Sequence, residues 1–140
     1  MKYALVNPNW DFQGSIYFGC REPHLPIEYG YAQALLRQQG HQVMLLDGHM
    51  YRLTLEQIRN RVTLFQPDYC VVTTAPSYLF WRCPQPELRV PLLTVQALRD
   101  CGATIIAVGP HGSATPEAVL KKLGADMVAV GEFEDLLQHL

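Results

Sequence analysis

Five short apolar segments alternate along the chain with longer segments in which apolar residues recur at helical spacing. Each of the five is continuously apolar, with no alternation of polar and apolar residues, which is typical of strands buried on both faces. Such strands occur in parallel sheets that helices cover on both sides. The pattern therefore predicts an α/β fold with strands over residues 3–6, 43–46, 69–72, 104–108 and 127–130.

The segment before the second strand has the periodicity of a helix. Ile27, Tyr31, Ala34 and Leu35 recur at a spacing that places them on one helical face, which we expect to be the buried face. Gly40 follows where the end of a helix favours a residue in the left-handed conformation. These residues predict a first helix that ends near Gly40.

Further helices begin at recognisable signals. Thr54 and Gln57 form a capping-box pattern, and Pro91 is expected to open the next helix. Thr115 followed by Pro116 is typical of an N-cap and a first helical residue. The chain thus predicts one domain over residues 1–140, a flavodoxin-like or Rossmann-like three-layer sandwich with helices on both faces of the sheet. A last amphipathic segment carries Phe133, Leu136, Leu137 and Leu140.

Two loops are longer than the connections that are usual in such units. About eighteen residues separate Asn7 from Pro26, and about fifteen separate Ala75 from Pro91. The loops follow the first and the third strand. By analogy with flavodoxin-like domains we expect the strand order 2-1-3-4-5, in which these two strands flank the switch point where open α/β sheets bind ligands. A binding site is therefore predicted at the carboxyl ends of the strands.

Aromatic residues are concentrated in these two loops. Aromatic walls favour a large flat ligand. The alternative is that the aromatic side chains bury one another as a lid, or that they face a second protein or another domain. The residues are Trp10, Phe12, Tyr17 and Phe18 in the first loop and Tyr78, Phe80 and Trp81 in the second.

Glycine placement excludes two familiar nucleotide sites. Gly14 and Gly19 lie five residues apart in a long loop, which does not match the dinucleotide-binding fingerprint, and the sequence contains no P-loop motif. The Gly-rich turn that opens a helix is 109–113, after the fourth predicted strand. There the missing side chains let a ligand approach the backbone.

Composition and charge narrow the function classes. The chain has 140 residues, of which 49% are hydrophobic, a net charge of -2 and no stretch of clustered Lys or Arg, so we do not expect nucleic acid as a partner. The sequence shows neither a run of about 18 apolar residues nor a signal peptide, so we expect a cytoplasmic protein without membrane contact. The four cysteines suit a reducing compartment and lack the spacing of zinc or iron–sulfur ligands. They are Cys20, Cys70, Cys83 and Cys101.

Several motifs, taken in order, resemble the cobalamin-binding domain that precedes the catalytic barrel in many radical S-adenosylmethionine (SAM) enzymes. The resemblance covers essentially the whole chain. Residues 25–41 resemble the family's P-x-G-L-x-Y-L-A helix and its L-R-x-x-G-H ending, and 45–47 match the end of its second strand. Residues 67–78 are similar to P-D-V-V-G-x-S-x-x-T-P-x-Y, 108–117 to G-G-P-H-x-S-x-x-P-E, and 126–134 to D-x-V-V-x-G-E-G-E.

The resemblance implies a bound cobalamin. Its nucleotide tail would lie in the crevice between the first and third strands, with the corrin over the strand ends. This sequence departs from the family pattern at Val108, where a glycine is usual, and at Phe133, which replaces the glycine of G-E-G-E. The residues that the resemblance assigns to the cofactor are Asn7, Pro8, Leu25, Pro26, Thr73, Thr74, Ala75, Pro76, Tyr78, Gly109, Pro110, His111, Gly112, Ser113, Gly131, Glu132 and Phe133.

The histidines bear on the cobalt. The D-x-H-x-x-G motif, which supplies an axial histidine in methionine-synthase-like domains, is absent after the first strand, where His24 is the only histidine of the loop. We therefore expect base-off cobalamin without a protein histidine. His49 is predicted to be a solvated turn residue and not a metal ligand. For His111, a hydrogen bond that fixes the turn and a contact with the cofactor remain two alternatives.

We identify no catalytic residue and no metal ligand in this chain. We interpret Glu132, Glu134 and Asp135 as an acidic cluster at a helix N-terminus. The resemblance implies that the [4Fe-4S] cluster and SAM belong to a radical SAM barrel of the same or a partner chain. This chain would then be the N-terminal part of a longer enzyme or a stand-alone version of that domain, with methyl transfer the first reaction to expect of the intact enzyme. The alternatives are a degenerate domain without cofactor that serves in interaction or substrate presentation, and a flavodoxin-like domain that binds a smaller nucleotide ligand.

Overall fold

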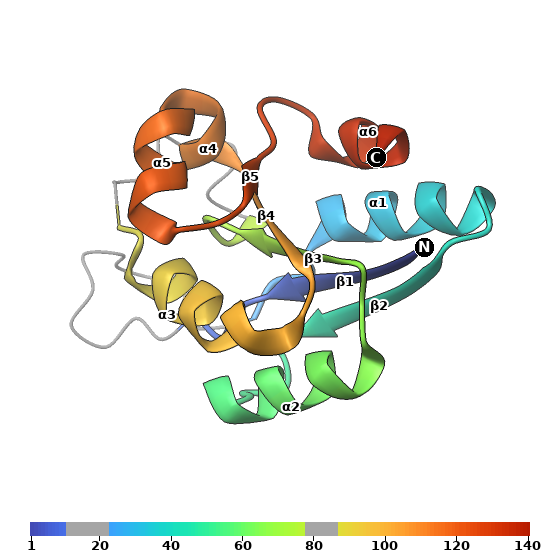
Figure 1. Ribbon diagram of the computed structural model, residues 1–140, viewed down its shortest axis with the longest axis horizontal. Helices are drawn as coiled ribbons and strands as arrows, with labels where there is room; N and C mark the ends of the chain where they lie inside the picture. The colour runs from blue at the N-terminus through green and yellow to red at the C-terminus, as the bar shows by residue number, and fades with distance from the viewer. Residues whose placement is uncertain (11–22, 78–86) are drawn as a thin grey trace.

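The computed structural model describes residues 1–10, 23–77 and 87–140. Within these ranges, five parallel strands form one sheet in the order β2-β1-β3-β4-β5 (Figure 1). The predicted fold class and strand order are confirmed. The strands are β1 (Lys2–Asn7), β2 (Gln42–Asp47), β3 (Tyr69–Thr73), β4 (Thr104–Val108) and β5 (Met127–Val128).

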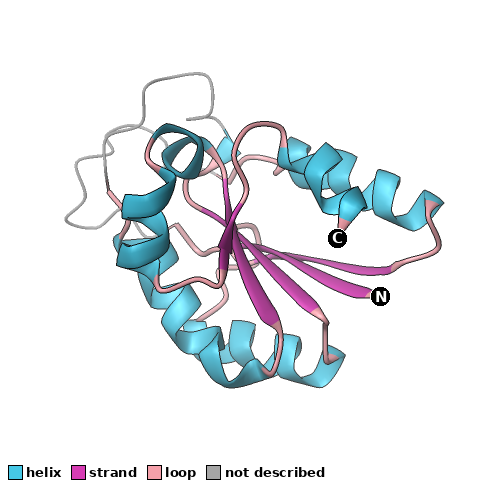
Figure 2. Cartoon of the chain, turned by 45° about the horizontal axis from the view of Figure 1, so that its top comes forward, coloured by secondary structure: helices cyan, strands magenta, loops and turns pink. Residues whose placement is uncertain are grey.

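Helices cover both faces of the sheet and complete a three-layer sandwich. Figure 2 shows α1 and α6 on one face, with α2 and α3 on the other. Short turns of 3-10 helix follow α3 at Arg99–Cys101 and α6 at Leu137–His139 (η3). The helices are α1 (Ile27–Gln38), α2 (Leu55–Phe65), α3 (Arg89–Leu98), α4 (Pro110–Ala114), α5 (Pro116–Leu123) and α6 (Phe133–Leu136).

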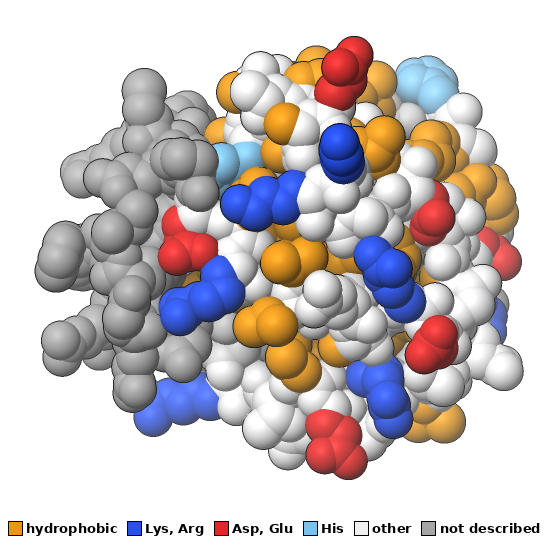
Figure 3. Space-filling view, turned by 60° about the vertical axis from the view of Figure 1, so that its left-hand side comes forward, with side chains coloured by type: hydrophobic (Ala, Val, Ile, Leu, Met, Phe, Trp, Pro, Cys, Tyr) orange, Lys and Arg blue, Asp and Glu red, His pale blue; other side chains and the backbone are white. Residues whose placement is uncertain are grey.

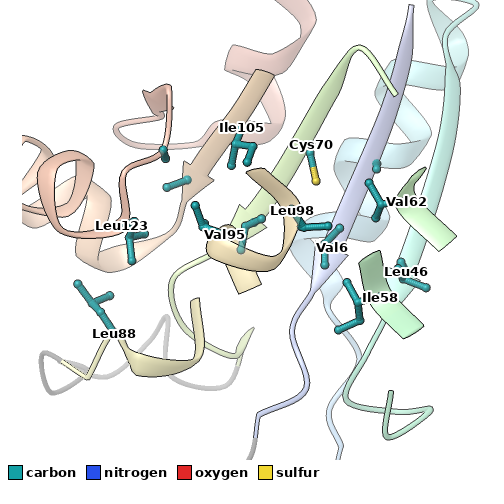
Figure 4. Close-up of a cluster of buried hydrophobic side chains, with 14 of the residues drawn as sticks. Val6, Leu46, Ile58, Val62, Cys70, Leu88, Val95, Leu98, Ile105 and Leu123 are labelled. Carbon is teal, nitrogen blue, oxygen red and sulfur yellow. The ribbon is translucent and has the colours of Figure 1, made fainter. Parts of the chain in front are cut away.

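The hydrophobic core is divided by the sheet into two clusters. Alternate residues of β1 face opposite sides: Val6 packs in the cluster under α2, α3 and α5, whereas Leu5 packs in the cluster under α1 and α6. Because helices cover both faces of the sheet, the side chains on both faces of a strand are buried. The strands are therefore apolar throughout and show no alternation with polar residues. Figure 4 shows the first cluster, in which Cys70 lies among aliphatic side chains and burial raises the pKa of its thiol.

The buried face of α1 differs from the predicted one. Tyr29, Ala32 and Leu36 are buried, whereas Ile27 and Tyr31 are 60% and 64% exposed. Tyr29 can lie inside because its hydroxyl finds acceptors there. It contacts the carbonyl oxygen of Val6 at 3.2 Å and that of Val71 at 3.0 Å, at neighbouring positions of β1 and β3.

Two other boundaries show what local signals can and cannot determine. The capping box of Thr54 is present, with the Gln57 N–H donating to the Thr54 hydroxyl. Thr115 is the N-cap of α5 and Pro116 its first residue, as predicted, but the Thr115 side chain does not cap the helix. Its hydroxyl donates to the carbonyl oxygen of His111 at 3.3 Å, because α4 immediately precedes α5. The fifth strand is also shorter than predicted, ending at Val128.

Two aspartates secure the amino-terminal edge of the sheet. A carboxylate oxygen of Asp68 accepts a hydrogen bond from the backbone N–H of Lys2 at 2.7 Å. Asp126 accepts one from the backbone N–H of Ile105, also at 2.7 Å. Each aspartate immediately precedes a strand, β3 or β5, and binds the strand beside it. These side chains therefore continue the pairing where the backbone ladder ends.

We expect Tyr29→Phe to lower the free energy of unfolding by about 1–2 kcal/mol, because it removes a buried hydroxyl that bonds to β1 and β3. Tyr31→Phe is the matched control on the same helix, and its exposed ring predicts a change within about 0.5 kcal/mol. Urea unfolding followed by circular dichroism measures both. Equal stability of the two variants would contradict the bridging role of Tyr29.

Candidate functional site

A cavity of about 410 Å³ opens near the carboxyl ends of β4 and β5. Its volume lies within the range of small-molecule sites. The first turn of α1, the start of α4 and the segment from β5 into α6 surround it. Its lining residues are Ile27, Glu28, Tyr31, Gly109, Pro110, Ser113, Gly131, Glu132, Phe133 and Glu134.

Six of the residues assigned by sequence lie around this cavity, namely Gly109, Pro110, Ser113, Gly131, Glu132 and Phe133. Four lining residues were not anticipated: Ile27, Glu28, Tyr31 and Glu134.

The other predicted site residues that the structure describes do not line the cavity, which opens at β4 and β5 and not between β1 and β3, where the nucleotide tail was expected. Leu25 and Pro26 precede α1, and Leu25 is 69% exposed. Tyr78 lies outside the described residues, as do Phe12, Tyr17, Phe18, Phe80 and Trp81. The remainder lie at or just beyond the ends of β1, β3 and β4 and are buried. They are Asn7, Pro8, Thr73, Thr74, Ala75, Pro76, His111 and Gly112.

One serine joins the two glycine turns at the cavity. The Ser113 hydroxyl donates to the carbonyl oxygen of Gly109 at 3.2 Å and accepts the N–H of Gly131 at 3.0 Å. Both glycines have φ in the left-handed region, +106° and +91°, which a side chain would strain. On one side of the cavity, the backbone at Gly109 and Gly131 therefore carries no side chain. The Ser113 hydroxyl holds both turns in place, and its proton is engaged in the hydrogen bond to Gly109.

Phe133 forms an inner wall. It is buried, and its ring meets that of Tyr29 edge-on, with 5.7 Å between centroids. At the same end of the sheet, Gly112 lies so close to β5 that an added Cβ would stand 2.8 Å from a Val128 methyl carbon. The start of α4 and the end of β5 are thus packed against each other.

Two threonines at the end of β3 differ in how their hydroxyls are satisfied. The Thr73 hydroxyl donates to the carbonyl oxygen of Ala75 at 2.7 Å. Thr74 is fully buried, and its hydroxyl has no hydrogen-bond partner among the described residues. Its backbone N–H donates to Val108 in β4. A buried hydroxyl without a partner is uncommon and costs stability, so its retention calls for an explanation.

A polar network connects the ends of β1 and β2. The Asn7 amide donates to an Asp47 carboxylate oxygen at 2.9 Å, and the Trp10 indole N–H donates to the Asn7 amide oxygen at 2.8 Å. The Gly48 N–H donates to the Asn7 carbonyl oxygen, and an added Cβ on Gly48 would lie 2.8 Å from that oxygen. The chain leaving β1 is therefore fastened to β2 before it enters the first long loop.

The turn after β2 corrects one prediction. His49 is 7% exposed and so is not a solvated turn residue. The same Asp47 oxygen that binds Asn7 also accepts the backbone N–H groups of His49 and Met50, at 3.2 and 3.0 Å. This folds the turn tightly back over the strand end and turns the His49 side chain inward.

Carboxylates from two elements approach one another at the cavity. Glu132 is the N-cap of α6 and Glu134 lies in its first turn. The predicted acidic cluster at a helix N-terminus is thus present. Glu28 comes from the first turn of α1. Burial raises the pKa of the Glu134 carboxyl, and the neighbouring carboxylates Glu132 and Glu28 raise it further, against the lowering effect of a backbone hydrogen bond.

One face of the molecule is mixed in charge. Figure 3 shows acidic and basic side chains interspersed on the face turned toward the viewer. Among residues 1–10, 23–77 and 87–140, no group of three or more His, Cys, Asp and Glu is arranged to hold a metal ion. None of the helices described there is long and apolar enough to cross a membrane.

No protein-family model matches this chain, and no curated protein matches its sequence. Solved structures do match its fold. The radical SAM methyltransferase TsrM from Kitasatospora setae, with tryptophan substrate and a SAM analogue bound, has a TM-score of 0.76 and 20% identity over 99% of this chain. OxsB, a cobalamin-dependent SAM radical enzyme with aqua-cobalamin and SAM bound, has a TM-score of 0.70 and 19% identity over 99% of this chain.

This chain spans 24% of the length of that TsrM chain and 18% of that OxsB chain. TsrM was also solved with cobalamin and a [4Fe-4S] cluster bound, and that structure matches with a TM-score of 0.66 and 21% identity. At this level of identity the likeness establishes the fold, a flavodoxin-like α/β arrangement.

We expect Asn7→Ala to lower the free energy of unfolding by about 2–3 kcal/mol, because it leaves the Trp10 N–H without its acceptor and Asp47 without one donor. The matched control is Asn60→Ala on the exposed face of α2, with an expected change of at most about 0.5 kcal/mol. In a Trp81→Phe background, the emission of Trp10 should shift to longer wavelength only in the Asn7 variant. An unshifted emission would show that Asn7 does not hold the indole.

Proposed function

We propose that residues 1–140 form a cobalamin-binding domain, the N-terminal part of a longer radical SAM enzyme. The main support is the cavity, which gathers residues from three of the motifs that suggested cobalamin, 25–41, 108–117 and 126–134. The fold shared with cobalamin-dependent SAM radical enzymes adds to it. We further propose methyl transfer as the reaction of the whole enzyme, with the cluster and SAM held by its barrel.

The residues present fit the nucleotide end of cobalamin. The cavity has room for a flat base with its sugar, and Ile27, Tyr31 and Phe133 give it apolar and aromatic walls. The bare backbone at Gly109 and Gly131 permits close approach. We further propose that the buried Thr74 hydroxyl at the end of β3, which has no partner among the described residues, bonds a polar group of the ligand.

The corrin would lie over the ends of β1 and β3. When bound, cobalamin supplies a cobalt centre that can carry and transfer a methyl group. This chain's own residues bind and orient it. The network of Asn7, Asp47 and Trp10 holds the end of β1, and Ser113 holds the glycine turns in register with the cavity.

Base-off binding without a histidine ligand remains part of the proposal. His24 is exposed just before α1, and His49 lies in the turn after β2, beside β1 and away from β3. His111 is buried in α4. The histidine motif expected after β1 for an axial ligand is missing from the sequence.

The first test is retention of the cofactor. After incubation with hydroxocobalamin and desalting, the protein should carry the corrin chromophore, and His24→Ala should leave the visible spectrum unchanged. An altered spectrum in that variant would contradict the absence of a histidine ligand. The proposal is wrong if cobalamin at about tens of micromolar is retained neither by the 140-residue chain nor by a longer chain that includes the barrel. A dissociation constant above that concentration is far weaker than a cofactor site requires. The domain would then be degenerate or would bind a smaller ligand.

Thr74→Val should separate stability from binding. Removing an unsatisfied buried hydroxyl should raise the free energy of unfolding by about 1 kcal/mol, while cobalamin affinity falls severalfold. The matched control is Thr94→Val, since the equally buried Thr94 hydroxyl donates to the Val90 carbonyl oxygen at 2.9 Å. The control should gain no stability and keep its affinity. Unchanged affinity in the Thr74 variant would remove this hydroxyl from the site.

A further inference from the structure

The cavity between α1, α4 and α6 has a one-sided hydrogen-bonding capacity. Among the lining residues within 1–10, 23–77 and 87–140 are three carboxylates, Glu28, Glu132 and Glu134, and no Lys, Arg or His. The Ser113 hydroxyl already donates its proton to Gly109 and accepts the Gly131 N–H. The cavity therefore presents mainly acceptors to a ligand, above apolar and aromatic walls.

Of the basic residues that the structure describes on and beside α1, α4 and α6, none lines the cavity. Arg37 lies in the last turn of α1, and His139 lies in η3, beyond α6. His111 of α4 is not a lining residue. Asp135 adds another acidic group to the first turn of α6. A phosphate in this cavity would meet negative charge with no cation among the described lining residues.

We propose that this cavity selects an uncharged or cationic group that donates hydrogen bonds, with Glu28 and Glu134 as the acceptors that determine specificity. This inference rests on the proposed function. Applied to cobalamin, it assigns the hydroxyl groups of the nucleoside sugar to the carboxylates and the base to the walls of Ile27, Tyr31 and Phe133. It leaves the phosphate outside the cavity.

The position of Glu134 supports a role beyond helix capping. Its carboxyl is partly buried beside Glu132, with Glu28 approaching from α1, and its pKa is raised as a result. A ligand that donates hydrogen bonds favours the charged carboxylate and lowers that pKa. By linkage, affinity for such a ligand rises as the pH increases through the raised pKa of the free protein. An anionic group in the cavity would give the opposite sign.

The decisive experiment compares two corrinoids, cobalamin and cobinamide, which lacks the nucleotide. Both are prepared with the same upper axial ligand on cobalt, and binding is titrated spectroscopically from pH 5 to pH 7. We expect the ratio of cobalamin to cobinamide affinity to increase with pH. Glu134→Gln should lower cobalamin affinity by about tenfold, the effect of losing one hydrogen bond to a charged group, and flatten the pH dependence. Its cobinamide affinity should not change.

Controls distinguish this inference from the proposed function. Glu56→Gln, an exposed substitution on α2 across the sheet, should leave both affinities and the pH profile unchanged. If both corrinoids bind equally and Glu134→Gln has no effect, the selective cavity is wrong while cobalamin binding stands. If the affinity ratio falls with pH, the cavity holds an anion and the inference is overturned. If neither corrinoid binds to the 140-residue chain or to a longer chain that includes the barrel, the proposed function fails with it.

Discussion

The parallel pairing of β1 with β3 is the constraint on which this architecture depends. Since β2 lies on the other side of β1, the chain crosses first to one edge of the sheet and then back past β1. Right-handed crossovers send these two connections to opposite faces, so α1 covers one face and α2 the other. The Tyr29 hydroxyl donates to carbonyl oxygens of both strands, Val6 in β1 and Val71 in β3, and so bridges the pair near their carboxyl ends.

The sequence predicts an element correctly where burial produces an unambiguous hydrophobic pattern. It does not where two packing arrangements suit the same pattern. The five strands were predictable because covering both faces removes every polar position. The orientation of α1 was not, because Tyr29 and Tyr31 both suit an amphipathic face and only the carbonyl groups of β1 and β3 decide which one turns inward. The short α4 was expected only as a turn, since proline and glycine weaken its helix signal and its packing on β5 compensates.

The candidate site shows the same division. Its glycine turns carry local signals, a glycine before Pro110 and a glycine before Glu132, and both line the cavity. No local signal brings Glu28 and Glu134 together, because they are more than a hundred residues apart and their meeting depends on the packing of α1 against α6. The burial of His49 was equally hidden, since it follows from how many donors one Asp47 oxygen gathers.

The hydrogen bonds of Asp68 and Asp126 at the amino-terminal ends of the strands separate the residues that stabilise the sheet from those that form the candidate site. Asp68 and Asp126 bind the amino-terminal ends of strands, whereas the cavity and the threonines of β3 lie at the carboxyl ends. The binding surface at the carboxyl ends of the strands can therefore be changed while the amino-terminal ends keep the strands in register. For protein engineering, this makes the domain a two-ended scaffold: robustness can be adjusted at one end and ligand choice at the other, with little interference between the two.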